Sequence, residues 1–217
     1  MPASAAVRRA DSRDRLPDAE RPRTRLWLDF VNTDAAAQMP GGDLLRDFEA
    51  LLSWLQQHAA IDEERASGIR RRAVLQPAAA AATLVDARRV RAALRALAER
   101  GVSIERVKED ALVEINRVLG RSAGTRRLEI APDGSYARSF VPTGDAFAGL
   151  MIPIVESAAD SLVFDELPRV RRCADPRCHR VFFDGTKNGL RRWCDMGTCG
   201  NRAKAARHRA RAIGGGA

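Results

Sequence analysis

The four cysteines of the chain lie in its last quarter, in two close pairs. The pattern is C-x4-C-x15-C-x4-C, formed by Cys173, Cys178, Cys194 and Cys199. Zinc prefers four soft or borderline ligands in a tetrahedron, and two short loops that each supply two thiolates surround an ion without long-range folding. The spacing therefore predicts one structural Zn²⁺ bound by these four thiols.

Two disulfides, or free buried or redox-active thiols, are the other chemistries open to these residues. The N-terminal segment has no apolar stretch of the kind that a secretory signal needs, so we expect a cytoplasmic protein whose thiols stay reduced. His179 follows Cys178 and is an alternative ligand, although four cysteines already complete the shell. We interpret His58 and His208 as ordinary surface or helix residues.

The segment around the cysteines is short of the apolar residues that a small domain needs. Its large apolar side chains are Val170, Val181, Phe182, Phe183, Leu190 and Trp193. Their burial does not offset the chain entropy of residues 169–212, whereas zinc binding to finger peptides is worth about 10–16 kcal/mol of apparent free energy. We therefore expect the metal to hold this segment together.

The positive charge of the chain is concentrated in the same segment. From Arg169 onward there are thirteen basic and three acidic residues, a net +10, whereas the whole chain carries +9. A block of this kind suits a polyanionic partner, although a solvated basic tail has the same composition.

A helix pattern follows the last cysteine, in RAKAARHRARAI. A small apolar stripe of Ala203, Ala206, Ala210 and Ile213 is predicted to lie against the finger. The basic face comprises Lys204, Arg207, His208 and Arg211. The nucleic-acid contacts that we predict come from Arg191, Arg192, Arg202, Lys204, Arg207, Arg209 and Arg211. A ligand in the first turn would fix this helix relative to the metal, as in treble-clef-type modules.

The fold class predicted for the rest of the chain is mainly α (α+β) with a small β-hairpin. Apolar periodicity predicts a first helix with Asp43 as its N-cap and Leu44 on its apolar face. It predicts further helices over 62–75, from Pro77 to Gly101, from Ser103 to Gly120, and over 145–167 with a kink at Pro153. Leu128, Ile130, Tyr136 and Phe140 flank Pro-Asp-Gly, which indicates the hairpin. The expected organisation is a flexible tail over 1–24, a helical domain over 25–168, a treble-clef-like finger over 169–213 and a flexible end over 214–217.

LWLDFVNT, residues 26–33, is apolar with β-branched Val31 and Thr33, but it is too short to be assigned as strand or helix. Asp29, Asn32 and Thr33 form a polar cluster in it. These side chains either line a pocket or, as Asn and Asp often do, cap a helix or tie the chain to a neighbouring segment.

Enzymatic chemistry is not indicated. The sequence has no Gly-rich phosphate loop, no nucleophile elbow and no His-based metal motif, so we expect no catalytic residues. Its longest apolar runs are far too short for a membrane span.

The finger sequence carries a family resemblance. RRCADPRCHRVFFDGTKNGLRRWCDMGTCGNRAKAARHRAR is similar to the CGNR zinc finger, named for the tetrapeptide that stands here as Cys199-Gly200-Asn201-Arg202, with Arg192-Trp193-Cys194 in the same pattern. LDFVNT and LLSWL, residues 51–55, resemble the ABATE domain that commonly precedes this finger. The resemblance implies a bacterial stress-induced transcription regulator with a DNA-binding finger and four cysteine ligands, and it implies no catalytic residues.

Three functions are compatible with these observations. The first is a zinc-dependent DNA-binding regulator, since charge, metal site and helix agree. The second is a protein- or RNA-interaction module, for which Phe182, Phe183 and Trp193 are the aromatic residues available for stacking. The third makes the helical domain an enzyme, for which no catalytic constellation is found, or a sensor, in which a small-molecule effector or a protein partner biases the placement of the finger.

Overall fold

The computed structural model describes residues 25–34, 42–99, 104–121, 124–130, 136–145 and 147–214. The tail expected over 1–24, the stops at Gly101 and Ser103, the Pro-Asp-Gly turn and residues 215–217 lie outside them. The described elements are α1 (Leu26–Val31), α2 (Phe48–Gln57), α3 (Glu63–Leu75), α4 (Pro77–Glu99), α5 (Ile104–Arg121), β1 (Gly124–Ile130), β2 (Tyr136–Pro142), α6 (Ile152–Val163), η4 (Leu167–Arg169), β3 (Val170–Arg172), β4 (Val181–Phe183), η5 (Met196–Gly200) and α7 (Asn201–Gly214). None of the described helices is long and apolar enough to cross a membrane.

The segment that the sequence left unassigned forms the short helix α1, followed by a turn at Asn32 and Thr33. This helix lies in the core. Trp27, Phe30 and Val31 are fully buried, and of the six helical residues only Asp29 is exposed. A helix that is buried all round shows no amphipathic period, which is why its pattern could not be distinguished from that of a strand. The indole Nε1 of Trp27 donates to Ser161 Oγ at 3.0 Å, so α1 is held against α6.

The second helix begins later than its sequence pattern indicated. Asp47, not Asp43, is the N-cap of α2, and its carboxylate accepts the N–H of Ala50 at 2.7 Å. Asp43 instead accepts the N–H of Leu45 and binds the buried guanidinium of Arg91. Leu44, expected on the apolar face, is half exposed because it precedes the helix. The expected N-cap was therefore wrong, and an ion pair across the fold is the reason.

Helices α3, α4 and α5 form where the periodicity predicted them. Asp62 caps α3 through the N–H of Arg65, Pro77 opens α4, and Ala111, Ile115 and Val118 bury one face of α5. Helix α5 continues through Gly120 to Arg121. Helix α6 begins only at Ile152, after turns over 147–150, so Pro153 lies in its first turn, where no helical N–H is needed. The expected kink at Pro153 was therefore wrong.

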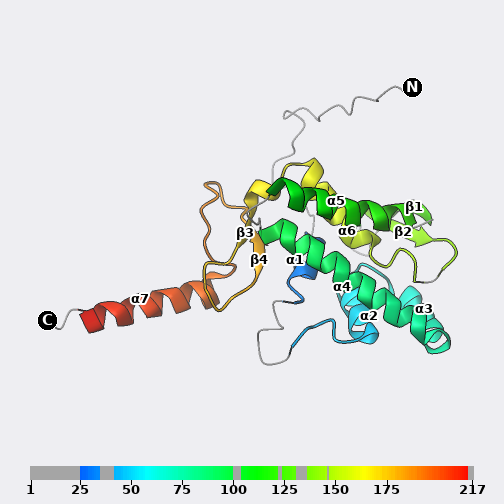
Figure 1. The fold of residues 1–217 in the computed structure, drawn as a ribbon, viewed down its shortest axis with the longest axis horizontal. Coiled ribbons are helices and arrows are strands. Elements are labelled where there is room, and N and C mark those ends of the chain that lie inside the picture. The colour runs from blue at the N-terminus through cyan, green and yellow to red at the C-terminus, as the bar shows by residue number, and fades with distance from the viewer. Residues whose placement is uncertain are drawn as a thin grey trace, which may run out of the picture.

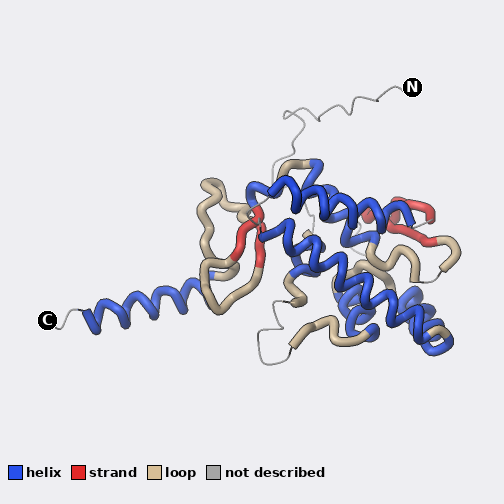
Figure 2. The backbone as a smooth tube through the Cα atoms, in the orientation of Figure 1, coloured by secondary structure: helices blue, strands red, loops and turns tan. Residues whose placement is uncertain are grey.

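The strands in the described ranges form two separate two-stranded sheets (Figure 2). The hairpin predicted around Pro-Asp-Gly is confirmed as β1 and β2, paired antiparallel from Gly124–Pro142 to Ile130–Tyr136. Strands β3 and β4 pair antiparallel within the finger. Figure 1 shows β1 and β2 at one end of the α4 and α5 pair and β3 and β4 at the other, with α7 extending away from the body.

The finger packs on the helical domain. Val170 of β3 and Val181 of β4 are buried in the same apolar cluster as α1 and α6, and Phe183 packs against it. The guanidinium carbon of Arg25 lies 3.2 Å from the ring centroid of Phe183. The core therefore runs continuously from the helices into the base of the finger, as expected when apolar residues are too few for the finger to form a core of its own.

Candidate metal centre and nucleic-acid interface

The four cysteines come together from the turn between β3 and β4, the loop after β4, and η5. Cys173 follows β3, Cys178 closes the turn before β4 by donating its N–H to the Asp175 carbonyl at 2.8 Å, and Cys194 lies in the loop after β4. Cys199 lies in η5, a π-helical turn that runs directly into α7. The four Sγ atoms all lie within 4.8 Å of one another. The structure thus brings all four predicted ligands to one point.

The spacing of the sulfur atoms fits a tetrahedral zinc ion. With Zn–S bonds of about 2.3 Å, the sulfurs of a tetrahedron lie about 3.8 Å apart. The Sγ atoms of Cys178 and Cys194 are 3.7 Å apart, and those of Cys194 and Cys199 are 3.8 Å apart. A disulfide needs about 2.05 Å, and all four thiols are free. The donor set and its geometry therefore define one structural zinc site, as predicted.

The surroundings of the cysteines act unequally on the pKa values of Cys194 and Cys173. Burial raises the pKa of Cys194 well above its ordinary value, and its hydrogen bonds with the Cys178 and Cys199 sulfurs add to the rise. Burial acts in the same direction on Cys173, but N–H groups of Asp175 and Cys194 outweigh it and lower the pKa of that thiol. A dication at the centre supplies the positive charge that four thiolates require.

Each residue of the CGNR tetrapeptide has a structural role at this centre. Cys199 supplies a ligand, and a Cβ at Gly200 would lie 2.7 Å from Met196 Sδ, so glycine allows the turn to close on Met196. Asn201 donates from Nδ2 to the Gly197 carbonyl at 2.9 Å. Arg202 donates from Nε to Asp175 at 2.7 Å and from Nη2 to Cys199 Sγ at 2.9 Å. The start of α7 is thereby tied to both cysteine pairs.

Replacing Arg202 with alanine is expected to lower zinc affinity about 10- to 100-fold, the usual cost of losing a group that orients a metal ligand. The variant leaves the buried carboxylate of Asp175 without its Arg202 partner and removes a positive charge from the thiolate of Cys199. Competition with a chromophoric zinc chelator measures the effect. Lys204→Ala is the matched control because it removes an equal charge from an exposed position of the same helix. Equal zinc affinity of the two variants would contradict this role.

A second buried carboxylate, Asp184, shapes the long loop between the two cysteine pairs. It is fully buried and accepts the N–H groups of Thr186 at 3.0 Å and Arg191 at 2.8 Å. Burial acts to raise its pKa, but the hydrogen bonds from Thr186 and Arg191 prevail and lower it. Arg169 donates to the Thr186 carbonyl at 2.6 Å and Arg171 to the Gly189 carbonyl at 2.6 Å. These arginines are therefore part of the internal scaffold of the finger.

The seven basic residues predicted to contact nucleic acid fall into two groups. The guanidinium of Arg191 donates to the backbone carbonyls of Trp193 and Cys194, and that of Arg202 binds Asp175 and Cys199. Arg202 is exposed despite these contacts, and the other exposed residues are Arg192, Lys204, Arg207, Arg209 and Arg211. Outside the predicted set, Arg177, Arg180 and Lys187 are also exposed on the finger. The charges available to a partner thus lie on α7 and on the loops beside it.

The apolar stripe of α7 does not pack as expected. Ala203 is half buried, but Ala206 and Ala210 are exposed, and α7 runs away from the finger (Figure 1). The side chain of Ile213 lies outside the described residues. Small residues at helical spacing indicated a contact, but only the first turn of α7 adjoins the finger. The prediction that this stripe lies against the finger was therefore wrong for Ala206 and Ala210.

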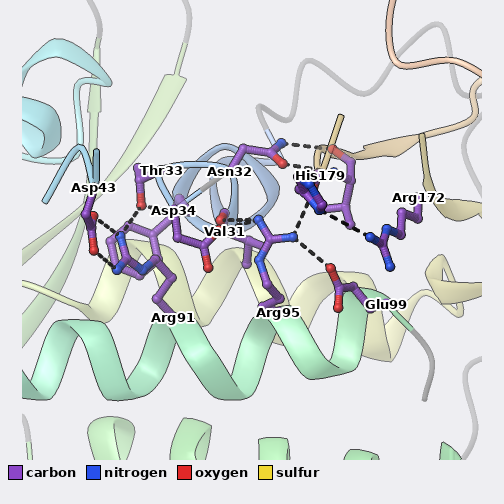
Figure 3. A network of polar contacts seen from close by, with 12 residues as sticks. Val31, Asn32, Thr33, Asp34, Asp43, Arg91, Arg95, Glu99, Arg172 and His179 are labelled. Atoms are coloured by element: carbon purple, nitrogen blue, oxygen red, sulfur yellow. Dashed lines mark hydrogen bonds and ion pairs between the residues drawn. The ribbon is translucent and has the colours of Figure 1, made fainter. Parts of the chain in front are cut away.

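Asn32 joins the helical domain to the finger (Figure 3). Its Nδ2 donates to the Val181 carbonyl at 2.8 Å, and its Oδ1 accepts the Val181 N–H at 2.9 Å, so the amide pairs with β4 as another strand would. Thr33 donates to the Phe30 carbonyl at 2.7 Å. Asn32 and Thr33 therefore tie the chain to neighbouring segments, which is one of the two roles expected for this cluster. Asp29 is exposed. In the described part of the structure a surface hollow of about 290 Å³ lies around the start of α2, and Asp29, Asn32 and Thr33 are not among the residues that line it. A pocket at this cluster stays a prediction.

Two arginines of α4 hold the segments around Asn32 in place (Figure 3). Arg91 donates to Thr33 Oγ1 at 2.9 Å and binds Asp43, whose pKa it lowers by hydrogen bonding. Arg95 donates to the Val31 carbonyl at 2.9 Å and to the His179 carbonyl in the finger at 2.8 Å. Sequence reasoning missed this role. Arginines one turn apart on an otherwise apolar face were the available signal.

The fold and site define a class of protein, a mainly helical domain that carries a four-cysteine zinc finger. Residues 24–164 match the ABATE family model, described as "Putative stress-induced transcription regulator", and residues 169–212 match the CGNR zinc finger. The first match covers more than half of the chain, so the chain belongs to the ABATE family and bears a CGNR zinc finger. No curated protein matches the chain closely enough to count as a relative.

Proposed function

We propose that this protein is a zinc-dependent DNA-binding transcriptional regulator, not an enzyme, and that it acts in the bacterial cytoplasm in a stress response. The observation that carries the proposal is the exposed basic face of α7, formed by Lys204, Arg207, His208 and Arg211, on a helix that directly follows η5 and its zinc ligand Cys199. Exposed arginine and lysine side chains on a helix whose first turn is placed by the metal centre suit the phosphates and base edges of a duplex.

The contact set in this proposal is smaller than the net charge of the finger suggests. Arg191 and the exposed Arg202 are already engaged by groups of the finger, and α7 offers the further exposed basic residues Lys204, Arg207, Arg209 and Arg211. Arg177, Arg180, Lys187 and Arg192 extend the surface on the adjoining loops. Four to eight phosphate contacts correspond to a slope of log K against log salt between about −3.6 and −7.

The aromatic side chains give less support to a single-strand or RNA module. Phe182, Phe183 and Trp193 are all partly buried. An arginine guanidinium lies over each ring. The guanidinium carbon of Arg25 lies 3.2 Å from the ring centroid of Phe183, that of Arg191 lies 5.0 Å from Phe182, and that of Arg192 lies 5.3 Å from Trp193. Stacking of bases needs open ring faces. Duplex DNA is therefore the favoured partner.

Fluorescence anisotropy with labelled duplex DNA, single-stranded DNA and RNA of equal length, each over a series of salt concentrations, tests the proposal. We expect the tightest binding to the duplex, with a slope in the range given above. Tighter binding to RNA or to single strands would instead favour the interaction-module function, and no binding to any of the three would refute a nucleic-acid function.

A sensor role of the helical domain is compatible with this function. Asn32 connects the end of α1 to β4, and Arg95 connects α4 to the His179 carbonyl. A shift of α1 or α4 would therefore change the position of the finger. An effector acts in this way only if it binds two arrangements of these elements unequally. A thermal-shift screen of the full chain with small molecules tests this role, which loses support if no compound raises the melting temperature.

A further inference from the structure

Helix α7 is anchored to the rest of the protein only by its first turn. Asn201 and Arg202 bind the finger, and Ala203 is half buried. From Lys204 to Arg211 every residue is exposed. Within the described part of the chain, the side chains of residues 204–211 make no hydrogen bond or ion pair to another segment. Figure 1 shows the helix extending from the body without a neighbouring element along its length.

Such a helix has little to stabilise it in the free protein. It has 14 residues, and isolated helices of about 12–15 residues are marginal in water even when rich in alanine. Tertiary packing of an apolar face supplies most helical stability in proteins, and the exposed alanines of α7 have no such packing. Lys204, Arg207 and Arg211 place like charges three and four residues apart, which opposes helix formation.

We infer that α7 completes its helix on entering the major groove of duplex DNA. The inference rests on the function proposed above and adds the way in which the partner is bound. In the free protein the first turn is held by the metal centre, while the turns after Ala203 exchange between helix and unfolded conformations. The helix of Figure 1 is then the conformation of the bound state.

The dimensions and side chains of α7 fit a groove better than a flat polyanion. Fourteen residues make a rod of about 21 Å. The major groove is about 12 Å wide and admits one α-helix, and the alanines beside the basic face keep this helix slender. Phosphates on both sides of the groove relieve the repulsion between Arg207 and Arg211, while Arg209, outside that face, reaches the opposite wall. A single strand offers the charge but not the enclosing shape.

The chemical shifts of the Cα carbons of Ala205, Ala206 and Ala210 report helix content along α7 directly. In the zinc-loaded full chain we expect values between those of coil and helix, moving to fully helical values on saturation with a 20-base-pair duplex. An equal concentration of single-stranded DNA should produce less than half of this change. Fully helical values in the free protein, or an equal change with the single strand, would overturn the inference.

Two glycine variants separate helix formation from direct contact. Ala205→Gly and Ala210→Gly lie on different sides of α7, and each weakens a helix by an amount that corresponds to about a fivefold loss of duplex affinity. Both should lose affinity equally, with the salt dependence of the parent and an unchanged zinc content. Parent-like affinity of both, or a loss confined to one, would contradict the inference. If the parent protein binds no duplex, the proposed function itself fails, whatever the helix content of α7.

Discussion

Cys199→Ser is expected to release the zinc ion and unfold the segment from Cys173 to α7, while the helical domain stays folded. Three remaining thiols hold zinc weakly, and apparent zinc-binding energies of about 10–16 kcal/mol are the folding energy of modules of this size. Cys199 is also the ligand joined to α7 through η5, so its loss frees the basic helix. Elemental analysis should fall from one zinc per chain to near zero, and duplex binding should be lost.

His179→Gln is the matched control for that variant. His179 adjoins Cys178, but its ring Nδ1 lies 3.2 Å from Arg172 Nη2, and the metal cluster is completed by the four thiols. This variant should keep one zinc per chain. A loss of zinc from His179→Gln equal to that from Cys199→Ser would mean that the ligand set differs from the four cysteines.

The double variant Arg207→Ala, Arg211→Ala is expected to weaken duplex binding about 30-fold at 0.15 M salt. Two fewer phosphate contacts make the slope of log K against log salt shallower by about 1.8. If the parent and the variant bind the duplex equally at 1 M salt, this difference in slope corresponds to about a 30-fold difference in affinity at 0.15 M. Both side chains are exposed on α7, so zinc content and the folded structure should not change. Anisotropy titrations at four salt concentrations provide both numbers.

Arg71→Ala, Arg72→Ala is the charge-matched comparison. These arginines are exposed near the end of α3, which Figure 1 places at the opposite end of the molecule from α7. This variant loses the same net charge and should keep nearly the affinity and slope of the parent. Similar losses in the two double variants would show that total charge, and not α7, determines binding.

The metal centre was predictable from the sequence because the cysteine spacing that defines it is local. Pairs of cysteines with four residues between them can reach one ion whatever the rest of the chain does, and the spacing alone identified Cys173, Cys178, Cys194 and Cys199. The longer helices were predictable for a similar reason, since α3, α4 and α5 each show one apolar face and begin or end with local signals.

The contacts that place the finger depend on residues far apart in the chain. Asn32 meets Val181 and Arg95 meets the His179 carbonyl only after the helices have packed, and no local pattern marks these pairs. The same applies to Asp43, whose partner Arg91 lies on α4. Helix α1 could not be assigned because burial on all sides removes the periodicity on which such assignments depend.

The division of the basic residues also required the structure. Arg191 and Arg202 stand in the sequence beside exposed arginines and have the same composition around them. Only the structure shows that their guanidiniums bind Cys194, Asp175 and Cys199 within the finger. Net charge alone therefore did not distinguish the basic side chains that are engaged within the finger from those with no such partner.

Reversible removal of the metal tests the link between zinc and DNA binding. Duplex affinity is measured for the purified, reduced protein, again after a strong chelator has removed the ion and been dialysed away, and again after one equivalent of Zn²⁺ is restored. We expect salt-dependent binding that is lost with the metal and recovered with it. Stripped protein that binds the duplex as tightly as the zinc-loaded protein would show that the metal does not position α7.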